Sequence, residues 1–209
     1  DRHIGLQFCC TGISHAASVG ESRARSHREV ANEMSDNPHV SRWSAVLGPE
    51  EGRALWQPLP SRGYVTVKLS PQTMPYDDFS AGIQVLPPGC HVREHGHKQN
   101  HELIFIYEGS GTVTIEGETR AIGPGSTILF GRYARHRIDN TGTTDMKLFW
   151  VFSPPGLEDW FESIGRERQP GEPTPAAFDR PQDVAEIQAR MRFVPPMPRP
   201  TESSPTESK

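Results

Sequence analysis

Apolar and polar residues alternate with a period of two through most of the middle of the chain. Side chains two apart in an extended strand share one face, so this alternation predicts strands with one buried face. Gly, Pro, Asn or Asp separates the segments at nearly every gap, which is typical of short antiparallel strands in a sandwich or small barrel. We therefore predict an all-β fold. Its strands cover residues 63–70, 81–89, 101–109, 111–117, 126–131, 136–140 and 146–152.

The period changes to that of a helix after the last of these strands. Four apolar residues follow the i, i+3, i+4, i+7 spacing of one helix face: Leu157, Trp160, Phe161 and Ile164. A second short helix is predicted within residues 180–193, where Val184, Ile187 and Met191 form one stripe behind the capping candidate Asp183. We expect both stripes to pack on the outside of the barrel, with a helix that binds a partner protein as the alternative.

These patterns divide the chain into five parts. The segment 1–33 has neither period and is read as a disordered leader or an upstream extension, while the Pro- and Ser-rich segment 194–209 is read as a disordered tail. An N-terminal arm covers 34–62, the barrel 63–153 and a helical segment 154–193. One domain with a sizeable core is expected.

Charge and cysteine content exclude several classes of partner. The net charge is −4, and no cluster of Lys and Arg stands on a predicted face, so neither nucleic acid nor an anionic membrane is an expected partner. The three cysteines, Cys9, Cys10 and Cys90, form no disulfide framework and no paired CxxC spacing. No apolar run approaches the roughly 18 residues that a membrane span needs, and no secretory signal is recognised. A soluble cytoplasmic protein is expected.

Four of the nine histidines lie within residues 91–101, where one predicted strand leads into the next. His95 and His97 share a strand face, so their imidazoles can hold one ion. His101 and Glu102 point to opposite faces, so only one of them can join the pair. Glu102 is favoured because it shares its parity with two isoleucines further along the strand, although a bulge would reverse this assignment. His136 opens a later strand, which a small barrel could bring opposite the others.

The spacing of these residues resembles the cupin superfamily. The first motif of that family is matched at every position, by Gly89, His95, His97, Glu102 and Gly109. The second is matched by Gly125, His136 and Asn140, whereas Gly131 and Tyr133 stand where Pro and Gly are usual. The departure at Tyr133 concerns a turn, because a tyrosine adopts a positive φ at a greater cost than a glycine.

The resemblance implies a double-stranded β-helix, the cupin or jelly-roll barrel, with a pocket at one end. Together with the helical spacing and the composition of the termini, this predicts an all-β barrel with one or two short C-terminal helices and disordered termini. The resemblance also implies that His95, His97, Glu102 and His136 bind one divalent metal. Three imidazoles and one carboxylate suit a transition metal, with Fe(II) expected first and Mn, Ni, Cu, Co or Zn as alternatives. His101 is expected to point outward or to donate a hydrogen bond near the site.

Three residues are candidates for contact with a substrate. Arg93 shares the parity of the two strand histidines and could bind a carboxylate or enolate, or it could pair with an acid at the barrel rim. Tyr107 and Trp150 are candidates for orienting a ligand and for an apolar wall, respectively. Gln84 and Tyr133 are further polar candidates.

The function expected first is that of a metal-dependent dioxygenase acting on a small phenolic or enolisable substrate together with O2, with Glu102 also serving as a base. The alternatives are a metal-dependent isomerase or lyase, in which His101 or Tyr107 moves a proton, and a binding protein without catalysis. A homodimer is expected, because the first barrel strand and the segment around Trp56 could pair across a two-fold axis. Trp43 and Trp56 are equally consistent with an arm that folds back over the barrel.

Overall fold

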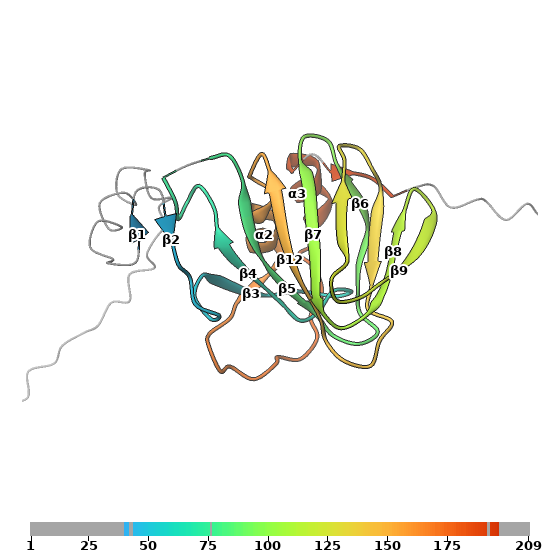
Figure 1. Ribbon diagram of the computed structural model, residues 1–209, viewed down its shortest axis with the longest axis horizontal. Coiled ribbons are helices and arrows are strands. Elements are labelled where there is room, and N and C mark those ends of the chain that lie inside the picture. The colour runs from blue at the N-terminus through green and yellow to red at the C-terminus, as the bar shows by residue number, and fades with distance from the viewer. Residues whose placement is uncertain (1–39, 42–43, 76, 192, 197–209) are drawn as a thin grey trace, which may run out of the picture.

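The computed structural model describes residues 40–41, 44–75, 77–191 and 193–196 of the 209-residue chain. The predicted leader at 1–33 and all but the first residues of the predicted tail lie outside the described residues. The described part is built mainly from two antiparallel sheets that face each other (Figure 1). This architecture confirms the predicted two-sheet cupin fold. No helix among the described residues is long and apolar enough to span a bilayer.

The larger sheet has seven strands in the order β10-β7-β12-β5-β4-β3-β13. Neighbours along this order pair antiparallel, and β12 pairs with both β5 and β7 over nearly its whole length. The strands are β3 (Arg53–Trp56), β4 (Tyr64–Leu69), β5 (Ser80–Leu86), β7 (His101–Glu108), β10 (Thr127–Phe130), β12 (Met146–Ser153) and β13 (Arg166–Glu167).

The smaller sheet has five strands in the order β14-β6-β11-β8-β9. Its strands are β6 (His91–His97), β8 (Gly111–Ile115), β9 (Glu118–Ile122), β11 (His136–Asp139) and β14 (Phe193–Val194). A separate pair joins β1 (Val40–Ser41) to β2 (Ser44–Ala45).

The core lies between the two sheets because alternate residues of their strands point inward. In β7 the isoleucines 104 and 106 are buried, whereas Leu103, Phe105 and Tyr107 are exposed. Buried residues of β12 and β11 meet them across the gap in one apolar cluster. All seven predicted strands are present, so the period-two pattern was a sound guide wherever one face is buried.

Several strands of the sheets lie outside the seven predicted ranges, among them β9 and β3. β9 is exposed at four of its five positions, so it carries no alternation, and its hairpin with β8 defines it instead. β3 lies in the predicted N-terminal arm but pairs with β4 of the same chain. Trp56 on β3 is buried, which agrees with an arm that folds back. Trp43 lies outside the described residues.

The C-terminal segment corrects one expectation. The two predicted helices are present as α2 (Glu158–Ile164) and α3 (Val184–Arg190), and they contact each other (Figure 1). However, the apolar stripe of α2 does not pack on the outside of the barrel. The ring of Phe161 lies 5.3 Å from that of Trp150 and 6.3 Å from that of Phe152, so α2 closes the interior at one end. The reason is that the two sheets leave an open apolar end that needs a cover.

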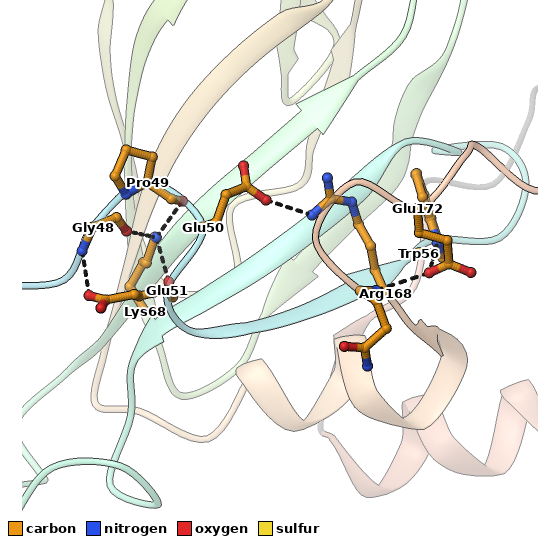
Figure 2. Close-up of polar contacts among 9 residues, drawn as sticks. Gly48, Pro49, Glu50, Glu51, Trp56, Lys68, Arg168 and Glu172 are labelled. Atoms are coloured by element: carbon orange, nitrogen blue, oxygen red, sulfur yellow. Dashed lines mark hydrogen bonds and ion pairs between the residues drawn. The ribbon is translucent and has the colours of Figure 1, made fainter.

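A polar network fastens both flanking segments to the larger sheet (Figure 2). The ammonium of Lys68 donates to three backbone carbonyls of the turn at residues 48–51. Arg168 forms an ion pair with Glu50 at 3.1 Å, and its guanidinium lies 4.1 Å from the ring centre of Tyr64. The indole of Trp56 donates to Glu172. These contacts hold the segment after β13 against β3 and β4.

Candidate metal centre

Three histidines of the centre come from neighbouring strands of the smaller sheet. His95 and His97 alternate along β6, and His136 is the first residue of β11. The pairing of these strands places His136 directly opposite His95. The rings consequently lie close together, with 4.4 Å between the centres of His95 and His136 and 5.1 Å between those of His97 and His136.

The fourth residue, Glu102, comes from the other sheet. It lies on β7 between Phe130 of β10 and Phe152 of β12, which are its partners in the ladder. Glu102 is buried, whereas its neighbour His101 is exposed. The parity of β7 thus resolves the choice between these two residues in favour of Glu102. The centre therefore bridges the two sheets.

The distances between the nitrogen and oxygen atoms of the cluster are those expected of ligands bound to one metal ion. Oε2 of Glu102 lies 2.9 Å from Nε2 of His97 and 3.1 Å from Nε2 of His136. One donor atom from each of the four residues lies within 4.8 Å of the other three. Two ligands at right angles with bonds of ~2.1 Å lie ~3.0 Å apart, so these spacings fit one transition-metal ion.

Hydrogen bonds to the backbone orient two of the rings. Nδ1 of His95 lies 2.8 Å from the carbonyl oxygen of Arg93, and Nδ1 of His136 lies 2.9 Å from that of Ala134. A carbonyl only accepts, so both Nδ1 atoms carry the proton and each neutral ring has a lone pair at Nε2. This arrangement, in which the second nitrogen is held by the protein, is usual for metal-binding histidines.

The cluster is not satisfied by its own hydrogen bonds. Nε2 of His136 is buried without a hydrogen-bond partner, although a carboxylate oxygen lies 3.1 Å away. A lone pair that faces a carboxylate is repulsive unless a proton or a metal cation lies between them. His97 has a second buried nitrogen, Nδ1, that also lacks a partner among the described residues. The donor set of three imidazoles and one carboxylate thus fits a divalent transition metal, as predicted, and leaves the metal's identity open.

The protonation states suit metal binding. Burial by itself raises the pKa of Glu102, but the short contacts with His136 and His97 outweigh burial and hold this pKa well below its usual range. Burial, reinforced by the nearby His136 and His97, lowers the pKa of His95 well below its usual value. At neutral pH the carboxylate is therefore ionised and the His95 ring is neutral, which are the forms that coordinate a metal.

Packing and a strained turn hold His136 in place. Its ring stacks on Phe130 with 3.7 Å between centres and an angle of 7°. The turn before it contains Tyr133, which has a φ of 68° and donates its N–H to the carbonyl of His97 at 2.7 Å. The residue that departs from the cupin motif thus keeps the positive φ that the usual glycine would adopt.

The four side chains belong to the lining of a cavity of about 60 Å³. One water needs about 10–15 Å³ by this measure, so the cavity admits a small organic molecule. Its walls are mainly apolar and include Ile104, Ile138, Phe152 and Phe161. The polar lining includes Arg93 and Gln84, both of which the sequence had marked as candidates.

The other candidates for substrate contact lie elsewhere. Tyr107 is 40% exposed on the outer face of β7, and it does not line the cavity. Trp150 is 1% exposed and packs against Phe152 in the core, in space that Gly82 leaves open. Tyr133 is exposed at the turn before His136. The structure therefore places Arg93 beside the centre and not these three.

Several cavity residues were missed because they follow the predicted barrel. Trp160 on α2, Arg180 before α3 and Phe193 on β14 all line the cavity. Phe193 pairs with His97, and its ring centre lies 5.4 Å from that of His95. Val194, the first residue of the predicted tail, is buried beside it. The apolar spacing of α2 signalled a buried face, but nothing local signalled which space that face fills.

The fold and the centre agree with the comparison to known families. The family model of the cupin domain matches residues 82–152, a span that contains His95, His97, Glu102 and His136. The match to the cupin domain therefore covers the central part of the chain, residues 82–152. This confirms the resemblance drawn from the two motifs, whereas β3, β4 and the whole C-terminal segment lie outside the matched span.

Similar proteins carry varied names. Protein SchB of Streptomyces halstedii is 27% identical over 92 residues, which are 44% of this chain and 67% of SchB. An L-ectoine synthase of Mycolicibacterium vanbaalenii is 39% identical over 62 residues, 28% of this chain and 46% of that protein. A solved structure described as a predicted oxalate decarboxylase from Thermotoga maritima has 26% identity and a TM-score of 0.46, covering 52% of this chain and 98% of its own.

Proposed function

We propose that this cupin is a metal-dependent dioxygenase that acts on a small phenolic or enolisable organic substrate. The His95, His97, Glu102 and His136 side chains would hold the ion, and Fe(II) is the metal we expect. Bound there, Fe(II) would supply a Lewis-acidic and redox-active centre beside the cavity. The donor set and the small apolar cavity support this proposal.

The observation that carries the proposal is the scarcity of proton-transfer groups in the cavity. Among the described residues that line it, the titratable side chains beyond the four of the centre are Arg93 and Arg180. Arginine stays protonated and is a poor acid or base. An isomerase or lyase that relies on His101 or Tyr107 has no support, because both side chains are exposed outside the cavity. Oxygenation needs less proton transfer than these reactions.

The residues of the chain would each have a defined task. The backbone carbonyls of Arg93 and Ala134 keep the Nε2 atoms of His95 and His136 directed at the centre. Glu102, which is buried, would accept the proton of an acidic substrate hydroxyl when it is displaced from the ion, because burial without a cationic partner raises the pKa of a carboxylate. Phe161 and Phe193 would exclude water from the reacting substrate.

Oxygen uptake tests the proposal. Protein loaded with Fe(II) would be mixed with catechols and small 1,3-diketones in an oxygen electrode, and the substrate would be followed by mass spectrometry. We expect O2 consumption with incorporation of oxygen atoms into the product. The His97→Ala variant should lose this activity, and His101→Ala should keep it. Conversion of any substrate at an equal rate without O2 would contradict the proposal.

A second candidate function is metal-dependent cyclisation or elimination without O2. The likeness to a protein named L-ectoine synthase, which extends over 62 residues at 39% identity, favours it. Glu102 would then be the sole base within the described lining. Assaying the same substrates without O2 separates the two candidates, because cyclisation or elimination would continue and oxygenation would stop.

We also propose that the protein is a cytoplasmic homodimer. The exposed row formed by Leu103, Phe105 and Leu129 on the outer face of the larger sheet is apolar enough to support self-association. Light scattering should report twice the 23.3 kDa mass of the chain. A monomeric mass at micromolar concentration would contradict the dimer.

A further inference from the structure

Two arginines from separate parts of the chain line the cavity that contains the metal centre. Arg93 lies on β6, two residues before His95 and within the cupin domain. Arg180 lies in the segment between β13 and α3, well beyond the matched span. Both belong to the cavity lining, and the guanidinium of Arg180 lies 5.9 Å from the ring centre of Trp160. The C-terminal segment thus adds a second cation to the site.

Neither cation is neutralised by the described part of the chain. No carboxylate among the described residues lies within ion-pair distance of Arg93 or Arg180, although six other acids there are paired with Lys, Arg or His. Nε of Arg180 is buried and has no hydrogen-bond partner among these residues. Burial and the charge of Arg93 lower the pKa of Arg180 to about 10.

The rest of the lining does not compensate these charges. Glu102 is the acid in the described lining, and its carboxylate is already in contact with His97 and His136. The remaining polar lining is neutral and consists of Gln57, Ser61, Gln84 and Gln188. Two unpaired guanidiniums in a partly buried site cost free energy unless an anion joins them, because a buried charge without a partner loses its hydration.

We propose that Arg93 and Arg180 form a receptor for a carboxylate group of the substrate, which makes the substrate a small organic acid. The planar guanidinium fork matches a carboxylate, and two forks can bind its two oxygens. The small volume of the cavity favours a short acid whose other end faces the His95, His97, Glu102 and His136 cluster. This inference rests on the proposed function only in taking the cavity as the substrate site.

Calorimetric titration of metal-free, full-length protein with succinate tests the receptor, with succinamide as the uncharged probe and inorganic phosphate as the competing anion. We expect succinate to bind and succinamide to bind at least tenfold more weakly. The variants Arg93→Gln and Arg180→Gln should each weaken succinate at least tenfold. Arg190→Gln, which removes an exposed arginine of α3 outside the cavity, should stay within twofold of the wild type.

Thermal unfolding without a ligand distinguishes a receptor from a structural role. Removing one of two unpaired cations relieves repulsion, so Arg180→Gln should unfold at the wild-type temperature or above it. A lower unfolding temperature, unchanged succinate binding in Arg180→Gln, or phosphate bound more tightly than succinate would each overturn the proposal. Because binding is measured without metal or O2, its failure is separate from a failure of the oxygen-uptake test.

Discussion

Replacing Glu102 by Gln is the sharpest test of the metal centre. The substitution keeps the shape of the side chain and its place between Phe130 and Phe152, but it removes the negative charge. The Oε2 atom that contacts Nε2 of His97 and of His136 then belongs to a neutral amide, a weaker ligand for a divalent cation. Its neighbour His101 supplies a matched control, because it lies on the same strand with its side chain exposed.

The expected loss follows from the number of ligands. Four-ligand structural zinc sites in zinc-finger peptides bind their metal with about 10–16 kcal/mol of apparent free energy, which sets the scale used for this cluster. One of four donors then accounts for roughly 2.5–4 kcal/mol, which corresponds to a 10²–10³-fold rise in Kd at about 1.4 kcal/mol per factor of ten. For Glu102→Gln we expect a value toward the upper end, since this residue is the one anionic ligand of the described cluster.

The measurement is metal content at buffered free metal concentration. Wild type, Glu102→Gln and His101→Ala would be equilibrated with Co(II) or Fe(II) in a chelator buffer, and bound metal would be determined by elemental analysis. We expect the metal Kd of His101→Ala to stay within about twofold of the wild-type value. Only a change that reaches a ligand is expected to shift the metal affinity by more than that. A Glu102→Gln protein that binds metal within threefold of wild type would refute the assignment of Glu102 as a ligand.

Three further predictions concern stability. Tyr133→Gly should raise the free energy of unfolding, measured by urea titration, by about 0.5–1 kcal/mol. Glycine adopts the φ of 68° without strain, and the tyrosine side chain that is removed is 60% exposed. A lower free energy of unfolding in the variant would contradict the strain argument. Lys68→Met should lower it by about 2 kcal/mol, because three carbonyls at residues 48–51 lose a charged donor. Burial, followed by the charges of Glu158 and Glu162, raises the pKa of Asp159 from 3.8 to about 6. The folded protein therefore binds a proton at this carboxyl more tightly than the unfolded chain does. The free energy of unfolding consequently falls as the pH rises from about 4 to 6. Asp159→Asn should flatten that fall and add about 1 kcal/mol at pH 7, after a discount for solvent screening of a partly exposed group; an unchanged pH profile would sink this reading.

Local pattern was a reliable guide where a strand has one buried and one exposed face. The alternation in β7 placed Glu102 inward and His101 outward before any tertiary contact was known. The same pattern was silent for β9, whose side chains are exposed on both faces. The parity of β7 also places Tyr107 on the outer face with His101, so the proposal that Tyr107 contacts a substrate conflicted with the alternation itself.

The site beyond the barrel required three-dimensional information. The spacing in α2 correctly indicated one apolar face, yet the expectation that this face covers the outside of the barrel was wrong. Arg180 lies just before the apolar stripe of α3, and nothing near it in the chain marks it as a partner of Arg93. Contacts between residues so far apart in sequence depend on how the open end of the two sheets is filled.

The amino-acid sequence by itself indicated the strands that have one buried face and placed His95, His97 and Glu102 on strand faces, because backbone geometry ties side-chain direction to local spacing. The resemblance to the two cupin motifs joined His136 to them. Tertiary structure alone decided that Glu102 meets the histidines from the opposite sheet, and that the C-terminal segment closes the cavity and brings Arg180 toward Arg93. The physical reason is that periodicity records which side of an element avoids water, whereas packing between distant elements determines what occupies that side.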